Sequence, residues 1–214
     1  MGIYIEAIIL YILLFFSVSA AQILGAPSQA QGFSVLGEAL RIVLNIIPSL
    51  ALIWYLLIKT WKIDYWGARL GKKDLISGFI TYPCLLLIGS SITLISIYIG
   101  GTSKIILHSP STAAGWAVLS LSCLLAAYLE ESFFRFYLLS KRKELNLSAS
   151  SALAFSVILF SVCHIYAGPW SFLNAVISGT FLGFMFLRYN SLHGIAIAHG
   201  LYNITLYILN AILN

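Results

Sequence analysis

Apolar residues follow one another along most of this chain in long runs, which short polar segments interrupt. A helix of about 20 apolar residues spans the roughly 30 Å hydrocarbon core of a bilayer. Seven runs approach or exceed that length, at residues 3–24, 33–58, 75–99, 112–139, 150–166, 170–187 and 195–213. The pattern predicts an all-α, polytopic membrane protein with about seven transmembrane helices.

The composition agrees with this class, because 60% of the 214 residues are hydrophobic and only 9% are charged. Soluble domains carry about 25% charged residues. We therefore expect one transmembrane domain over residues 1–214, in contact with the lipid bilayer. The first apolar run has no basic segment before it and no convincing cleavage site, so we interpret it as a retained helix and not as a signal peptide.

The twelve Lys and Arg residues are distributed unevenly between the segments that connect the apolar runs. Nine of them lie in residues 59–74, in 141–144 and at position 188, which are alternate connections, whereas Lys104 lies in a connection of the opposite set. Positively charged loops face the cytoplasm. The sequence predicts a cytoplasmic N-terminus and a non-cytoplasmic C-terminus, and this topology explains the net charge of +5 without a nucleic-acid partner.

The fourth apolar run contains three ionisable residues, Glu130, Glu131 and Arg135. Insertion scales assign roughly 2.5–3.5 kcal/mol to each charged residue at the centre of a membrane helix, so the three cost on the order of 8–10 kcal/mol. The eleven Leu, Val and Phe residues of this run favour insertion into the membrane by only about 3–7 kcal/mol. The charged side chains must therefore face other helices or water. Ionisable residues inside a membrane protein usually mark a functional site, so we take these three as candidate site residues.

The spacing within this run separates the two glutamates. Glu131 and Arg135 are four residues apart in the favourable order, so the arginine can neutralise the second glutamate. Glu130 points about 100° away on the helix. This geometry leaves Glu130 without a charged partner on its own helix.

The same spacing of four residues recurs on two later runs, where Phe160 is followed by His164 and His199 by Asn203. A carboxylate, two imidazoles and a carboxamide from three helices are what peptide hydrolysis needs without a covalent nucleophile. A base takes a proton from water, a histidine positions that water, and donors stabilise the oxyanion.

Three segments carry a resemblance to a known family: Glu130-Glu131-x-x-x-Arg135, then Phe160-x-x-x-His164, then His199-x-x-x-Asn203. In this order on consecutive late helices they resemble the three-motif signature of the CPBP family. That family contains the CAAX prenyl endopeptidases of the Ras-converting type and the bacteriocin-processing or immunity proteins of the Abi group. The similarity extends from about Thr112 to the C-terminus. It implies accessory helices at about 1–100 and a catalytic core at about 110–214, with the last four helices enclosing the site.

The resemblance implies a glutamic intramembrane endopeptidase without a metal or other cofactor. By motif position, Glu130 is the general base that activates water, and His164 helps to hold that water. By the same resemblance, His199 and Asn203 form the oxyanion site. The residues expected to support these groups are Glu131, Arg135 and Phe160. The implied partner is a membrane-anchored or membrane-adjacent peptide or protein, with or without a lipid modification, and the implied location is a prokaryotic cell membrane.

Other chemistries remain open from the residues alone. One is zinc-dependent hydrolysis of the peptide bond, because Glu130, His164 and His199 can supply three ligands to a zinc ion, although no HExxH segment is present. Serine catalysis lacks a Gly-x-Ser-Gly segment. A thiol nucleophile is disfavoured because Cys163, next to His164, is expected to point to a different helix face.

Two further interpretations do not involve proteolysis at these residues. A bacteriocin immunity protein or a proton-coupled transporter can use buried carboxylates and histidines as a relay, without protease activity. In the second apolar run, Glu38 and Arg41 are three residues apart, and we interpret them as a structural ion pair. His108 and His193, near the ends of runs, are expected at the membrane interface.

Overall fold

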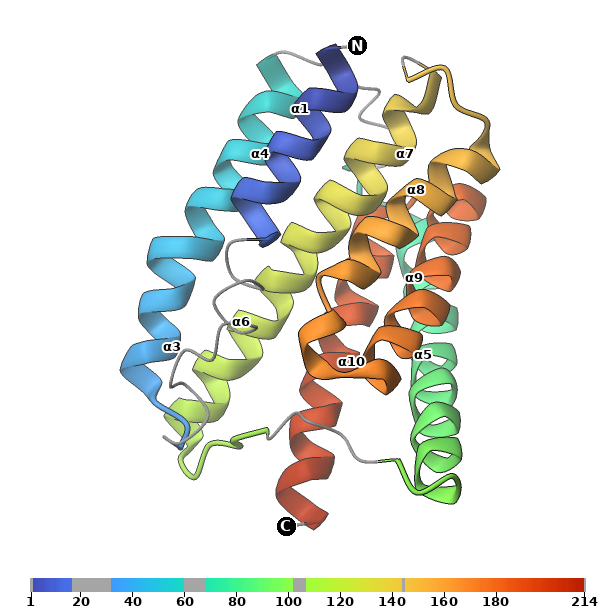
Figure 1. Ribbon diagram of the computed structural model, residues 1–214. Helices are drawn as coiled ribbons and strands as arrows, with labels where there is room; N and C mark the ends of the chain where they lie inside the picture. The colour runs from blue at the N-terminus through green and yellow to red at the C-terminus, as the bar shows by residue number, and fades with distance from the viewer. Residues whose placement is uncertain (1, 17–31, 60–67, 102–106, 144, 214) are drawn as a thin grey trace.

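The computed structural model describes residues 2–16, 32–59, 68–101, 107–143 and 145–213, and the elements in these ranges are helices (Figure 1). The N-terminal helices are α1 (Gly2–Tyr11) with η1 (Ile12–Phe16), and α3 (Val35–Arg41) with η2 (Ile42–Ile46) and α4 (Ile47–Lys59). They are followed by α5 (Lys72–Tyr98), α6 (Ala113–Glu131), η4 (Ser132–Tyr137), α7 (Leu138–Ser140), η5 (Lys141–Lys143), α8 (Ala149–Val162), η6 (Ile165–Ala167), α9 (Pro169–Tyr189) and α10 (Leu192–Leu213).

The chain runs back and forth through one bundle, with the N-terminus at one end and the C-terminus at the other (Figure 1). Five helical stretches of the described chain are long and apolar enough to cross a membrane, and shorter apolar helices cover Ile5–Phe15 and Ala149–Val162. The protein is therefore an all-α integral membrane protein, as the sequence predicts. Residues 17–24, the end of the first predicted run, lie outside the described residues.

Serine and threonine side chains begin three of these helices. Thr112 caps α6 by accepting a hydrogen bond from the Gly115 amide, and Ser148 caps α8 by accepting one from Ser151. Ser34 caps α3 in the same way. Such caps satisfy backbone donors that have no partner in the first turn of a helix.

The helix that carries Glu130 is longer than the sequence analysis predicts. It continues past Leu139 to Lys143, giving 31 residues or about 46 Å of length, and it crosses the bundle obliquely (Figure 1). Its middle, Ser132–Tyr137, is a π-helical segment in which every residue is buried. Single π turns are rare and occur often at functional sites.

The helix before His164 is shorter than predicted. We expected a span over 150–166, but α8 has 14 residues, or about 21 Å, and ends at Val162. Gly168 then adopts a positive φ of 96° and Pro169 begins α9, so the chain reverses. In the view of Figure 1, this hairpin of α8 and α9 ends above the lower ends of α5 and α10.

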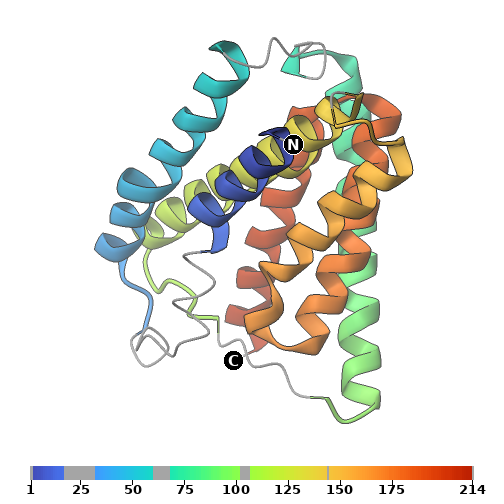
Figure 2. The ribbon, with the colours of Figure 1, turned by 45° about the horizontal axis from the view of Figure 1, so that its top comes forward.

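The N-terminal helices pack against the middle of the bundle through aromatic side chains. The ring of Phe15 lies 4.8 Å from that of Phe134, and Trp54 stacks on Phe136 at 5.7 Å. Figure 2 shows α3 and α4 along one edge of the bundle, next to α6. The helices of residues 1–100 therefore form part of the same core as the later ones.

On the other side, α10 packs against both α5 and α6. Gly200 makes the approach to α6 possible, because a Cβ at this position would lie 2.7 Å from the Leu124 side chain and 3.0 Å from the Leu124 Cα. The adjacent residue, His199, is thereby held against the helix that carries the two glutamates.

Candidate active site

Glu131 is the residue that links the first and third sequence motifs. Its side chain is fully buried, and its Oε1 accepts hydrogen bonds from Arg135 Nη1 at 3.2 Å and from His199 Nδ1 at 2.9 Å. The pairing with Arg135 follows the predicted spacing. The contact with His199 joins α6 to α10, and the sequence analysis did not predict it.

Arg135 is also fully buried and uses three kinds of contact. Besides Glu131, its Nη2 donates to the Gly179 carbonyl at 3.2 Å, and its guanidinium lies 4.3 Å from the centre of the Phe160 ring. A buried charge needs a counter-charge and hydrogen bonds to offset its lost hydration. Glu131, Gly179 and Phe160 supply these, so Arg135 joins three helices around the site.

Glu130 has a different environment from its neighbour. Its side chain is 23% exposed, and its Oε2 has no hydrogen-bond partner. This oxygen is buried, and His199 Nε2 lies 3.8 Å from it. The two glutamates thus differ as their spacing predicts: Glu131 is fully buried and bonded to Arg135 and His199, and the side chain of Glu130 borders an open space.

That open space is a cavity of about 180 Å³ next to Glu130. His164 lines it as well, so α6 and the turn after α8 deliver a carboxylate and an imidazole to one space. The other lining residues come from several helices: Leu14, Phe15, Arg41, Asn45, Ile46, Ala126, Leu129, Cys163 and Tyr166. The volume exceeds the roughly 30 Å³ that one water molecule occupies in the liquid.

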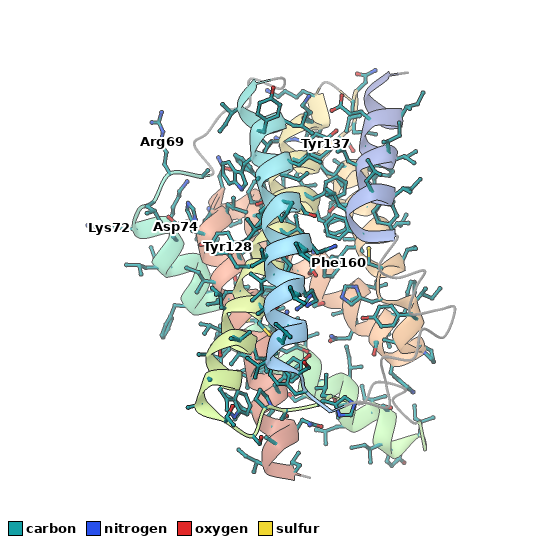
Figure 3. The ribbon with its side chains drawn as sticks, turned by 90° about the vertical axis from the view of Figure 1, so that its left-hand side faces the viewer. Arg69, Lys72, Asp74, Tyr128, Tyr137 and Phe160 are labelled. Carbon is teal, nitrogen blue, oxygen red and sulfur yellow. The ribbon has the colours of Figure 1, made fainter. Side chains whose placement is uncertain are left out.

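His164 is oriented by the backbone of its own helix. Its Nδ1 lies 2.9 Å from the Phe160 carbonyl, and the two rings are 4.8 Å apart (Phe160 is labelled in Figure 3). A carbonyl oxygen only accepts hydrogen bonds, so Nδ1 carries the proton and Nε2 of the neutral ring has a free lone pair. Phe160 therefore positions His164 through its carbonyl and its ring, which agrees with the supporting role expected from the sequence.

Asn203 lies one turn after His199 on α10 and is half-buried. It is not among the residues that line the Glu130 cavity. Of the predicted catalytic residues, Glu130 and His164 line the cavity, and His199 lies next to Glu130 without lining it. The role of Asn203 in binding an oxyanion stays a prediction.

The comparison with family models gives one match. The family described as "Type II CAAX prenyl endopeptidase Rce1-like" matches residues 112–205. Residues 112–205 are similar to this family. The match confirms the resemblance stated above, and it implies that the protein is a protease, hence a hydrolase. No curated protein and no solved structure matches the chain.

The Rce1-like region contains all seven predicted site residues, but it does not form the cavity alone. Leu14 and Phe15 in η1, with Arg41, Asn45 and Ile46 in and before η2, line the cavity from outside the matched range. Both η1 and η2 are π-helical segments, as is η4 immediately after Glu130. Two of these segments, η1 and η2, therefore contribute lining residues to the cavity, and the third begins two residues after Glu130.

Arg41 is the residue at this site that sequence reasoning missed. Its predicted ion pair with Glu38 is present at 2.6 Å, but its Nη2 also donates to Ser122 of α6 at 2.5 Å, and the side chain is 48% exposed. The cavity therefore reaches the protein surface beside Arg41. Asn45, four residues later, shares its helix face, and this spacing of two polar residues was the signal in the sequence.

The expectation that Cys163 and His164 lie on different faces of one helix was wrong. Because α8 ends at Val162, Cys163 and His164 lie in a turn, and both line the cavity next to the Glu130 carboxylate. Different helix faces for these two residues would require a helix that continues to Tyr166, as predicted from the apolar run. The Cys163 thiol lies 3.5 Å from the Tyr11 hydroxyl and 3.5 Å from the Leu159 carbonyl.

A tightly packed layer closes the bundle on the other side of Glu130, toward α7. Phe133, Phe134, Phe136, Tyr137 and Leu138 are each at most 1% exposed. None of these five residues lines the Glu130 cavity.

Among the residues that the structure describes, no group of three or more His, Cys, Asp or Glu side chains is arranged to hold a metal ion. The ligand set considered for zinc, Glu130, His164 and His199, is not assembled as such a group.

Proposed function

We propose that the protein is an intramembrane endopeptidase that hydrolyses a peptide bond of a membrane-anchored or membrane-adjacent protein with water activated by Glu130. The observation that carries this proposal is the contrast between the two glutamates. Glu131 is fully buried and fixed by Arg135 and His199, whereas the Glu130 side chain is 23% exposed and lines the cavity.

The chemical step begins with a water molecule held in the cavity by Glu130 and by Nε2 of His164. Glu130 takes a proton from this water as its oxygen attacks the peptide carbonyl, and a tetrahedral oxyanion forms. The same proton passes from Glu130 to the leaving amine when the C–N bond breaks. General base catalysis of this kind contributes about 10²–10⁴-fold to the rate.

His199 and Asn203 are proposed to stabilise the oxyanion. His199 donates through Nδ1 to Glu131, so Nε2 is the nitrogen directed at Glu130 and the reacting carbonyl. To donate from Nε2 as well, the ring must carry a proton on both nitrogens. The amide of Asn203, one turn further along α10, supplies the second donor once a substrate is bound.

The function is tested on membrane peptides of cells that produce either the intact chain or its Glu130→Gln variant at equal levels. Peptides with new termini are expected by mass spectrometry only with the intact chain. The same peptides with both chains, or with neither, would overturn the proposal. An Asn203→Ala variant separates hydrolysis from proton transport: hydrolysis loses most of its rate, and a transporter tolerates the change.

Metal dependence is tested on the purified chain in liposomes. We expect cleavage to continue at its original rate after dialysis against EDTA or 1,10-phenanthroline, because Glu130 and not a metal ion activates the water. Loss of cleavage that zinc restores would support the zinc mechanism instead.

A further inference from the structure

A second and larger cavity, of about 730 Å³, lies between α5 and α10. Its lining residues are Leu70, Gly71, Asp74, Leu75, Gly78, Phe79, Tyr82, Pro83, His193, Gly194, Ile197 and Leu201. We call it the α5–α10 groove. It contains none of the proposed catalytic residues, and α5 lies outside the Rce1-like region. Its volume falls within the roughly 300–1,000 Å³ of typical ligand sites.

The walls of the groove are suited to a hydrocarbon chain. Its outer walls include Leu75 and Phe79, which are 77% and 85% exposed. Its floor is deep because Gly78 and Gly194 meet there: a Cβ on Gly78 would lie 3.2 Å from the Gly194 carbonyl oxygen. Because α5 and α10 are both long enough to span the membrane, these walls face the acyl chains of the bilayer.

The charged residues at one end of the groove are mainly basic. Arg69 and Lys72 flank the lining residues Leu70 and Gly71, and Figure 3 shows both on the outside of the molecule near Asp74. The Asp74 carboxylate is buried and accepts hydrogen bonds from Ser191 Oγ at 2.5 Å and from the Gly71 amide at 2.8 Å.

Asp74 is thus a structural cap within the groove, and the cations are the charged groups that face outward. Basic residues next to a pocket between transmembrane helices favour anionic lipid head groups, by about 1 kcal/mol for each Lys or Arg near the surface. The lining of this apolar groove includes Leu70 and Gly71, the chain neighbours of the two cations, so the groove matches a molecule with a hydrocarbon chain and a phosphate at its end.

We propose that the α5–α10 groove binds one anionic phospholipid, with its phosphate at Arg69 and Lys72 and an acyl chain along Leu75, Phe79 and Leu201. The phospholipid belongs to the leaflet on the side where α5 begins. The proposal does not depend on the proposed protease reaction, because binding is measured without turnover.

One wall residue connects this groove to the helix of Glu130. His193 Nε2 lies 2.9 Å from the Ala68 carbonyl and therefore donates to it, which leaves Nδ1 to accept from the Tyr128 hydroxyl at 3.1 Å. Tyr128 is on α6, two residues before Glu130 (Figure 3). A lipid in the groove thus contacts a side chain that is bonded to the helix of the proposed base.

Native mass spectrometry of the full chain in detergent, with added phosphatidylglycerol or phosphatidylcholine, tests the proposal. One phosphatidylglycerol per chain is expected to remain bound, and phosphatidylcholine to bind more weakly. The double variant Arg69→Gln/Lys72→Gln should bind phosphatidylglycerol about tenfold more weakly. The control Lys143→Gln/Arg188→Gln removes two exposed cations elsewhere and should stay within about twofold. Equal weakening in both variants, or equal binding of both lipids, would refute a specific site.

A second variant tests the hydrocarbon part of the groove. Ile197 lines the groove and is 42% exposed. The Ile197→Trp variant adds bulk to this wall, so it should displace both phospholipids although Arg69 and Lys72 are retained. Unchanged thermal unfolding of each variant shows that the loss is local. Retention of an isoprenylated peptide, without any phospholipid, in the wild-type groove would overturn the proposal in favour of a substrate site.

Discussion

Replacement of Glu130 by glutamine is expected to lower kcat for peptide cleavage by about 10³-fold, within the 10²–10⁴ range of general base catalysis. Glutamine keeps the shape of the side chain but cannot take a proton from water. The protein should stay folded, because Glu130 Oε2 has no hydrogen bond to lose. Initial rates with a purified membrane-anchored peptide, together with thermal unfolding, measure both effects.

Two matched variants make this result specific. Cys163→Ala removes the thiol of the cavity and should leave kcat within about twofold, because this thiol hydrogen-bonds to the Tyr11 hydroxyl and the Leu159 carbonyl. Glu131→Gln changes the adjacent carboxylate and should destabilise the fold, since it removes the counter-charge of Arg135. A Glu130→Gln enzyme with a rate within tenfold of wild type would exclude Glu130 as the base.

Replacement of Arg135 by methionine is expected to lower the free energy of unfolding by about 3–5 kcal/mol, the usual cost of removing one partner from a buried ion pair. Methionine retains much of the side-chain volume but leaves the Glu131 carboxylate buried without its cation. It also removes the donor to Gly179 and the contact with the Phe160 ring. Equilibrium unfolding in mixed micelles, followed by circular dichroism, measures the change.

The double variant Glu131→Gln/Arg135→Met should recover part of this loss, because no unpaired charge then remains in the core. Arg188→Met is the control, since Arg188 is exposed and its side chain lies 5.4 Å from the Tyr189 ring. Its effect should stay below about 1 kcal/mol. A loss below about 1 kcal/mol for Arg135→Met as well would show that the buried pair contributes little to stability.

The sequence predicts the fold class and the pairing of Glu131 with Arg135 because both depend on local information. Apolar runs report membrane helices directly, and a spacing of four residues reports a shared helix face. The end of α8 was misplaced because Cys163, His164 and Tyr166 extend the apolar run without a breaking residue before Gly168. Contacts between helices, and not the run itself, determine where that helix ends.

The contacts between helices at the cavity were beyond such reasoning. Glu38 satisfies Arg41 within one helix, so nothing in the sequence indicates that Arg41 also reaches Ser122 of α6. The link from His199 to Glu131 likewise joins residues 68 positions apart. The π-helical segments η1 and η2, which contribute to the cavity wall, have no signature in the apolar pattern, since an extra residue in a helical turn does not change the hydrophobicity of the residues.

The shortness of α8 has a consequence for the surrounding membrane. A helix of about 21 Å cannot match a hydrocarbon core of about 30 Å, and hydrophobic mismatch of this size is relieved by local thinning of the bilayer. Head groups and solvent are then drawn inward toward the turn that holds His164. A polar peptide segment would reach the cavity over a shortened path, without crossing the full depth of undisturbed lipid.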